Sequence, residues 1–406
     1  MSKAAPAGGL PRGVQLFGLV SLLNDFASEM IYPLLPAFVT GVLGAGAEAL
    51  GALDGAAEFA AAVVKFGAGR LADRPVRRGR LVVLGYAAAV AVRPVISLAG
   101  AAWQVIGLRV IDRLGKGLRT PPRDALIADM TPPALRGRAF GVQRGLDHVG
   151  AVLGPVVAWW LLTLHRANLR GVIAASVVPG VLALLLAAVA VKHAAPDDHV
   201  RETAKRAVAA SAAMPAGAGA RTMPPLLLAI AAFYLLRMPE TLIILRAQQL
   251  GVAVAVVPLL WAAVHVVKAS SSFVGGGWSD RFGPARTMWV GWLCYAALAA
   301  GFSAATSVRA AWALFLALGI VAGLTESPER ALVARLAGTR QGSGFGVYHG
   351  VTGLAALIGG VALGALFQSG GGPRAFAVSA GLGATLVLVA AVGRATMRPP
   401  VMSTRR

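Results

Sequence analysis

Long apolar segments follow one another along almost the whole chain, and each is long enough to cross a lipid bilayer as a helix. We expect such spans near residues 14–41, 48–71, 80–100, 103–129, 138–164, 170–191, 224–249, 253–278, 286–306, 309–336, 343–368 and 374–396. A helix of about 20 residues spans the hydrocarbon core, whereas membrane β-barrels show short alternating segments. The sequence therefore predicts an all-α membrane protein with twelve transmembrane helices.

The composition supports a membrane protein, since 57% of the 406 residues are apolar, 14% are charged and the mean hydropathy is +0.71. Soluble domains carry more charge and fewer apolar residues. The single cysteine, Cys294, lies in an apolar span and excludes an internal disulfide or a cysteine metal cluster. The first apolar run is long and opens directly into a span, so we expect no cleavable signal peptide.

The net charge of +21 is concentrated in a few connections between spans. Basic residues gather between the second and third spans, between the sixth and seventh, and at the C-terminus. The positive-inside rule then predicts that both termini and the middle loop are cytoplasmic, in a bacterial inner membrane. Because basic loops are the expected determinant of topology, the charge does not indicate a nucleic-acid partner.

A basic, Ala-rich segment over residues 192–223 divides the chain almost in half. We expect an N-terminal six-helix bundle over 1–191, a cytoplasmic linker over 192–223 and a C-terminal six-helix bundle over 224–406. Three stretches of the first half recur in the second half at almost the same distance along the chain. GRLADRPVRR from Gly69 corresponds to GGWSDRFGPAR from Gly276, and FGVQRGLDHVGAVLG from Phe140 corresponds to FGVYHGVTGLAALIG from Phe345. The third pair is Gly117–Asp129 and Gly323–Arg335. Such duplication predicts pseudo-symmetric halves with a solute path between them.

Four stretches of the chain resemble motifs of the major facilitator superfamily. Gly69, Asp73, Arg74, Arg77 and Arg78 match its loop motif, with Val76 at a usual glycine, and Asp280, Arg281 and Gly283 match the second-half copy. The fourth-span motif is matched by Arg109 and Gly115, while Asp112 and Arg113 replace its usual Gln-Gly pair. The fifth-span antiporter motif is matched by Gly141, Gly150, Gly154 and Pro155, while Ala158 and Trp159 depart from it. The resemblance implies secondary transport by alternating access, usually proton-driven, without nucleotide hydrolysis, enzymatic activity or a cofactor.

The fourth span carries charges at helical intervals. Arg109, Asp112, Arg113 and Lys116 recur every three or four residues and therefore share one face. A mid-membrane Arg or Lys costs roughly 2.5–3.5 kcal/mol, so this face requires a watery cavity or paired acids. One hypothesis is a substrate site, and the alternative is a permanently paired network that holds the N-terminal half together.

Acidic residues in other spans are candidates for proton coupling. Asp25 and Glu29 lie one helical turn apart, where repulsion and desolvation favour protonation of at least one of them. Either acid could instead be locked to Arg113 or Lys116. Three further candidates are Glu58, Asp147 and His148, although His148 could simply donate to a carbonyl.

The remaining candidates belong to the cavity wall and to gates. We expect Arg144, Arg237, Glu240, His265, Tyr348 and His349 at the cavity, with no metal bound. Candidate gating residues are Asp73, Arg74, Arg119, Arg123, Asp124, Asp280, Arg281, Glu326, Glu329 and Arg330. The repeat alignment sets Arg123 against Glu329, and we expect this pair to close the cytoplasmic opening in the outward-facing state.

These features together predict a monomeric transporter in the lipid bilayer that moves a small molecule at the expense of a proton gradient. The leading hypothesis is proton-coupled export of a small organic compound or drug-like metabolite, with Asp25 or Glu29 as the proton site opposed by Arg109 or Arg113. The rival is proton-coupled uptake of a small anionic metabolite or chelate. A receptor needs no duplicated gating motifs, and no spacing resembles a zinc or serine-nucleophile site.

Overall fold

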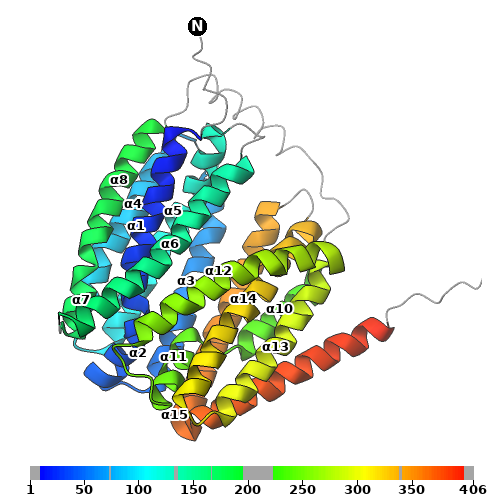
Figure 1. Cartoon of the computed structure of the whole chain (residues 1–406). Coiled ribbons are helices and arrows are strands. Elements are labelled where there is room, and N and C mark those ends of the chain that lie inside the picture. Colours follow the sequence, from blue (N-terminus) through cyan, green and yellow to red (C-terminus); the bar gives the residue numbers. More distant parts are fainter. Residues whose placement is uncertain are drawn as a thin grey trace, which may run out of the picture.

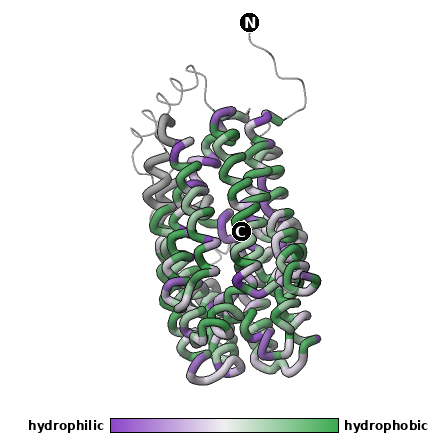
Figure 2. The backbone as a smooth tube through the Cα atoms, turned by 90° about the vertical axis from the view of Figure 1, so that its left-hand side faces the viewer, coloured by the Kyte–Doolittle hydropathy of each residue, from purple (hydrophilic) through white to green (hydrophobic). Residues whose placement is uncertain are grey.

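The described part of the chain is helical throughout. A computed structural model describes residues 10–72, 75–131, 136–165, 167–194, 223–337 and 341–396. The helices run roughly side by side, and apolar residues cover most of their length (Figures 1 and 2). Eight described helical stretches are apolar and long enough to cross a membrane, the last of them covering both predicted C-terminal spans. The all-α membrane fold is therefore confirmed.

The N-terminal half follows the predicted order of spans. Its long helices are α1 (Arg12–Ile31), α3 (Ala47–Ala72), α4 (Pro75–Val95), α5 (Ala102–Met130) and α6 (Arg136–Thr163). After α1 the chain continues through η1 (Tyr32–Leu34), α2 (Leu35–Ala37) and η2 (Phe38–Val42), and after α4 through η3 (Ile96–Leu98). The last predicted span of this half consists of α7 (Leu169–Ala175) and α8 (Val177–His193).

The C-terminal half contains the remaining helices. They are α10 (Met223–Leu236), α11 (Glu240–Gln249), α12 (Val257–Phe282), α13 (Pro284–Ala304), α14 (Val308–Ala337) and α15 (Gln341–Thr396). Within α15, Gly371 has a φ of 78°, a left-handed conformation that glycine adopts without strain. The helical axis turns there, so α15 supplies the last two predicted spans.

Three predicted spans are not continuous helices, and proline explains each interruption. Proline lacks an N–H and clashes with the carbonyl four residues earlier. Pro33 and Pro36 convert the end of the first span into short turns, and Pro179 coincides with the break between α7 and α8. Pro239 separates α10 from α11, which leaves the first N–H groups of α11 free for other acceptors.

Most helix packing occurs within each half. In the first half α1 packs against α6 and α8, and α3 and α4 pack against α5; in the second, α14 packs against α12 and α13, and α15 packs against α10 and α13. The halves meet where α3 packs on α15 and α6 on α12. This packing agrees with two bundles, but the boundary at 192–223 stays a prediction because residues 195–222 lie outside the described part.

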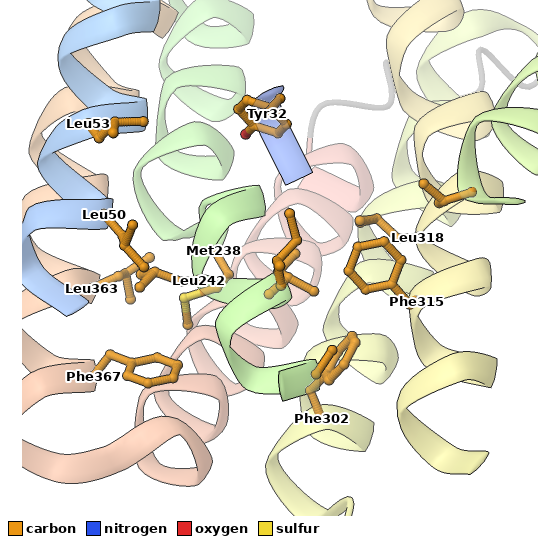
Figure 3. Close-up of a cluster of buried hydrophobic side chains, with 14 of the residues drawn as sticks. Tyr32, Leu50, Leu53, Met238, Leu242, Phe302, Phe315, Leu318, Leu363 and Phe367 are labelled. Atoms are coloured by element: carbon orange, nitrogen blue, oxygen red, sulfur yellow. The ribbon is translucent and has the colours of Figure 1, made fainter. Parts of the chain in front are cut away.

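The halves are closed together at the end of the molecule opposite the start of α1, which we call the distal end (Figure 1). At this end α3 and α15 approach so closely that a Cβ at Gly55 would lie 2.7 Å from the Cα of Leu357. The Ala47 N–H donates to the Gln368 side chain at 2.7 Å. Apolar side chains from both halves fill the space between them, with Leu50 of α3 beside Leu363 of α15 (Figure 3).

Candidate substrate cavity between the two halves

A cavity of about 470 Å³ lies between the halves above this apolar layer. Most predicted site residues line it: Asp25, Glu29, Glu58, Arg109, Arg113, Lys116, Arg119, Arg123, Arg144, Asp147, Arg237, Glu240, His265, Glu326, Arg330, Tyr348 and His349. Asp112, Asp124, His148, Arg281 and Glu329 are not part of its lining. The side chains of Asp73, Arg74 and Asp280 lie outside the described residues, so their gating roles stay predictions.

Asp112 was expected at the cavity surface but is a buried counter-ion instead. Its side chain is 1% exposed and accepts from two guanidinium groups, Arg93 Nε at 3.0 Å and Arg109 Nη1 at 3.3 Å. Arg93 also donates to the Asn24 carbonyl at 3.1 Å, which ties α4 to α1. Burial favours this arrangement because an isolated charge in a low-dielectric interior is costly. The paired-network hypothesis therefore holds for this part of α5.

Arg119 and Arg123 are satisfied within the N-terminal half. Arg119 donates to the carbonyl of Gly85 and to the side chain of Asn24, both at 3.1 Å, and stacks over the Tyr86 ring at 4.6 Å. Arg123 pairs with Asp124 at 2.9 Å. These contacts anchor α5 to α1 and α4.

The predicted Arg123–Glu329 pair is not formed in this conformation. Glu329 instead accepts a hydrogen bond from the Tyr348 hydroxyl at 2.7 Å, and Tyr348 is 3.4 Å from the Tyr234 hydroxyl. The pair was expected in the outward-facing state, in which the end opposite the distal end is closed. It therefore stays a prediction for the outward-facing state.

The two first-span acids have different partners. Asp25 accepts from the side chain of its neighbour Asn24 at 2.9 Å. Glu29 accepts from the indole N–H of Trp261 at 2.9 Å and lies 4.0 Å from His265 Nε2. Glu29 is thus bonded across the interface to α12. The alternative that Arg113 or Lys116 locks Glu29 stays open.

Asp54 is a functional candidate that the sequence analysis missed. Its carboxylate accepts from Tyr32 Oη at 3.2 Å, from the Thr241 N–H at 3.1 Å and from Thr241 Oγ1 at 2.8 Å. Thr241 belongs to the first turn of α11, where backbone N–H groups lack helical partners and favour an anion. Asp54 therefore joins α3 to α11 at the distal end of the cavity. An acid within an apolar span was the available signal, as it was for Glu58.

On α6, Arg144 and Asp147 form an i,i+3 pair at 3.7 Å, as their shared helix face predicts. Arg144 is 56% exposed, so the pair contributes little stability. His148 on the same helix is half-buried beside the cavity rather than in its lining.

Four charged side chains of the C-terminal wall alternate in sign. Arg237 lies 3.6 Å from Glu240, Lys268 lies 3.9 Å from Glu240, and Lys268 lies 3.0 Å from Glu326. The chain of contacts joins α11, α12 and α14, with every charge next to one of opposite sign. His265, one turn before Lys268, faces Glu29 from this wall.

Comparisons with known proteins agree with this architecture. The chain matches the Major Facilitator Superfamily over residues 17–245 and 226–405. It is 28% identical to the uncharacterized MFS-type transporter MJ1317 of Methanocaldococcus jannaschii over 86% of each chain. A POT family transporter in complex with a thioalcohol-conjugated peptide has a similar fold, with a TM-score of 0.76 at 12% identity over 97% of this chain and 98% of that one. A stretch covering 40% of each chain is 30% identical to the multidrug resistance protein MdtH of Photorhabdus laumondii.

The family match, together with the helical halves and the cavity between them, defines a multi-pass membrane transporter rather than an enzyme. The chain belongs to the Major Facilitator Superfamily, and it is a secondary transporter.

Proposed function

We propose that this transporter works by alternating access and couples the movement of a small organic compound to protons, with Glu29 as the proton-binding group. The observation that carries the proposal is the contact of Glu29 with Trp261 and His265, because it joins an ionisable group of one half to the other half. Protonation removes the negative charge that the indole N–H and the imidazole contact. Proton binding at Glu29 therefore changes how strongly α1 and α12 hold together.

Asp54 supports the same proposal from the distal end. Its hydrogen bonds to Thr241 stabilise the closed arrangement of α3 and α11. In the outward-facing state these bonds must break, because the two halves separate there. Asp54 and Glu29 are therefore two acids whose bonding we expect to differ between the states of the transport cycle.

Two observations bear on the direction of transport. Export of a small organic or drug-like compound is supported by the partial similarity to MdtH and by the fifth-span glycine pattern. Uptake of a small anion is supported by the cationic N-terminal wall, where Arg109 and Arg113 line the cavity. Inside-out inner-membrane vesicles with an acidic interior distinguish the two directions. Accumulation of the solute in these vesicles indicates export in exchange for protons. Accelerated loss of the solute from them indicates uptake together with protons.

Proteoliposomes that contain the purified protein test the coupling itself. We expect Glu29→Gln to abolish solute accumulation driven by a pH gradient but to retain exchange of labelled for unlabelled solute, which needs no net proton movement. His165→Gln is the matched control, since this residue lies outside the cavity lining. Unchanged gradient-driven accumulation by Glu29→Gln would contradict the proposal.

A further inference from the structure

Arg113 differs from the other cations of the N-terminal wall because it lines the cavity without a bonding partner. It makes no hydrogen bond or ion pair with the residues that the structure describes, and its Nε is buried without an acceptor. The carboxylates that act on it electrostatically are Asp112, Glu58 and Glu29, and none lies within the 4.0 Å of an ion pair.

These carboxylates have partners of their own. Asp112 is shared between Arg93 and Arg109, and Glu29 accepts from Trp261. Glu58 acts on Arg113 electrostatically and is itself not without a partner. A guanidinium that keeps its charge in a membrane interior needs a counter-charge or water. An anion that enters the cavity is the partner that the described residues do not supply.

Aromatic rings lie next to this cationic wall. The rings of Tyr32 and Trp261 are 5.0 Å apart at 45°, and both line the cavity. The guanidinium of Arg109 lies 5.3 Å from the centre of the Tyr32 ring. The cavity of about 470 Å³ is within the range that holds drug-sized ligands. A ligand bound at Arg113 can therefore place an apolar body against these rings.

We propose that Arg113 binds the oxyanion of an organic solute, a carboxylate or a phosphate ester, whose apolar body packs against Tyr32 and Trp261. The planar guanidinium offers parallel N–H donors that match two oxygens of either group, which an ammonium does not. Arg113 stands where the fourth-span motif usually has a glycine, so the site is a property of this chain. The proposal rests on the proposed function only in that the cavity carries an organic solute, and it does not depend on proton coupling.

Equilibrium binding to the full-length protein in detergent, without a pH gradient, tests this site. The probes are 1-naphthoate, 1-naphthyl phosphate and neutral 1-naphthamide, and the readout is the concentration-dependent increase in Tm. We expect one or both anions, but not the amide, to raise the Tm of the wild type, and the preferred anion identifies the headgroup. Arg113→Gln should weaken anion binding about tenfold to hundredfold. Arg113→Lys should retain part of the affinity, and the exposed Arg309→Gln is the matched control for loss of a positive charge.

Three results would overturn the proposal: no anion raises the wild-type Tm, the amide binds as well as the anions, or Arg113→Gln binds the anions unchanged. The ligand-free Tm shows whether each variant is folded, and if Arg113→Gln is not, the Lys variant decides. Arg113-dependent binding together with uncoupled transport would contradict the proposed function alone. Coupled transport with Arg113-independent binding would contradict this site alone.

Discussion

The two walls of the cavity differ in how their charged side chains are paired. On the C-terminal wall, Glu240 and Glu326 alternate with Arg237 and Lys268 within 4.0 Å, so each charge has a neighbour of opposite sign. On the N-terminal wall, two guanidiniums share Asp112, and Arg113 is left without an ion-pair partner among the described residues.

This difference is the basis of the proposed anion site at Arg113. A compensated chain such as that of the C-terminal wall holds helices together and presents little net field. An uncompensated cation beside aromatic rings attracts an anion. The two halves therefore share their helical architecture but differ in how their charges are paired.

The buried part of the N-terminal wall should be the most sensitive to substitution. Asp112→Asn leaves Arg93 and Arg109 without their carboxylate, and removing one partner of a buried ion pair costs about 3–5 kcal/mol. We expect a correspondingly lower free energy of unfolding, measured by thermal or denaturant unfolding in detergent. Asp25→Asn is the control, and an equal loss there would remove the distinction between buried and cavity-facing acids.

Charge reversal tests whether the walls meet in the other state. Arg123→Glu and Glu329→Arg should each lower transport about tenfold or more. Each variant places like charges opposite each other when the predicted cytoplasmic opening closes. The double variant should recover transport if the residues pair across the opening. Equal loss in the single and double variants, all at wild-type abundance, would refute the pair.

A smaller effect is expected at the distal end. Thr241→Val removes the hydroxyl that donates to Asp54 at 2.8 Å and keeps the backbone N–H. Loss of a hydrogen bond of about 1 kcal/mol shifts the population of the open distal end by about fivefold. Labelling of Ala57→Cys by an impermeant maleimide from the distal side, in a Cys294→Ser background, measures this opening. An unchanged labelling rate would show that this bond does not hold the distal end closed.

The C-terminal wall should tolerate substitution best. Lys268 and Glu326 are 23% and 34% exposed, so solvent screens their pair. Glu326→Gln should lower the free energy of unfolding by about 1 kcal/mol or less. A loss as large as that of Asp112→Asn would contradict the proposed difference between the walls.

Much of the fold could be predicted from the sequence, because span length and internal repeats are local properties. Helical spacing also placed Arg109, Arg113 and Lys116 at the cavity. Spacing could not identify partners that lie far along the chain. Glu29 meets Trp261 and Asp54 meets Thr241 only because the halves pack together. The ion pair of Arg93 with Asp112 was not predicted, because the sequence analysis assigned Asp112 to the cavity surface.

The proposed anion-binding residue, Arg113, interacts electrostatically with the proposed proton-binding residue, Glu29. We expect an anion bound at Arg113 to offset the positive charge of this guanidinium and so to promote proton uptake by the protein. Glu29 is also contacted by His265 and by the Trp261 N–H, and Asp25 acts electrostatically on the same His265. His265 could take up the proton instead, so His265→Gln is the control.

Proton exchange on addition of 1-naphthoate, followed with a pH dye in weakly buffered detergent solution, tests this claim most directly. We predict proton uptake by the wild type and by His265→Gln, and none by Glu29→Gln, although all three bind the anion. Proton release by the wild type, or uptake that persists in Glu29→Gln, would contradict the account.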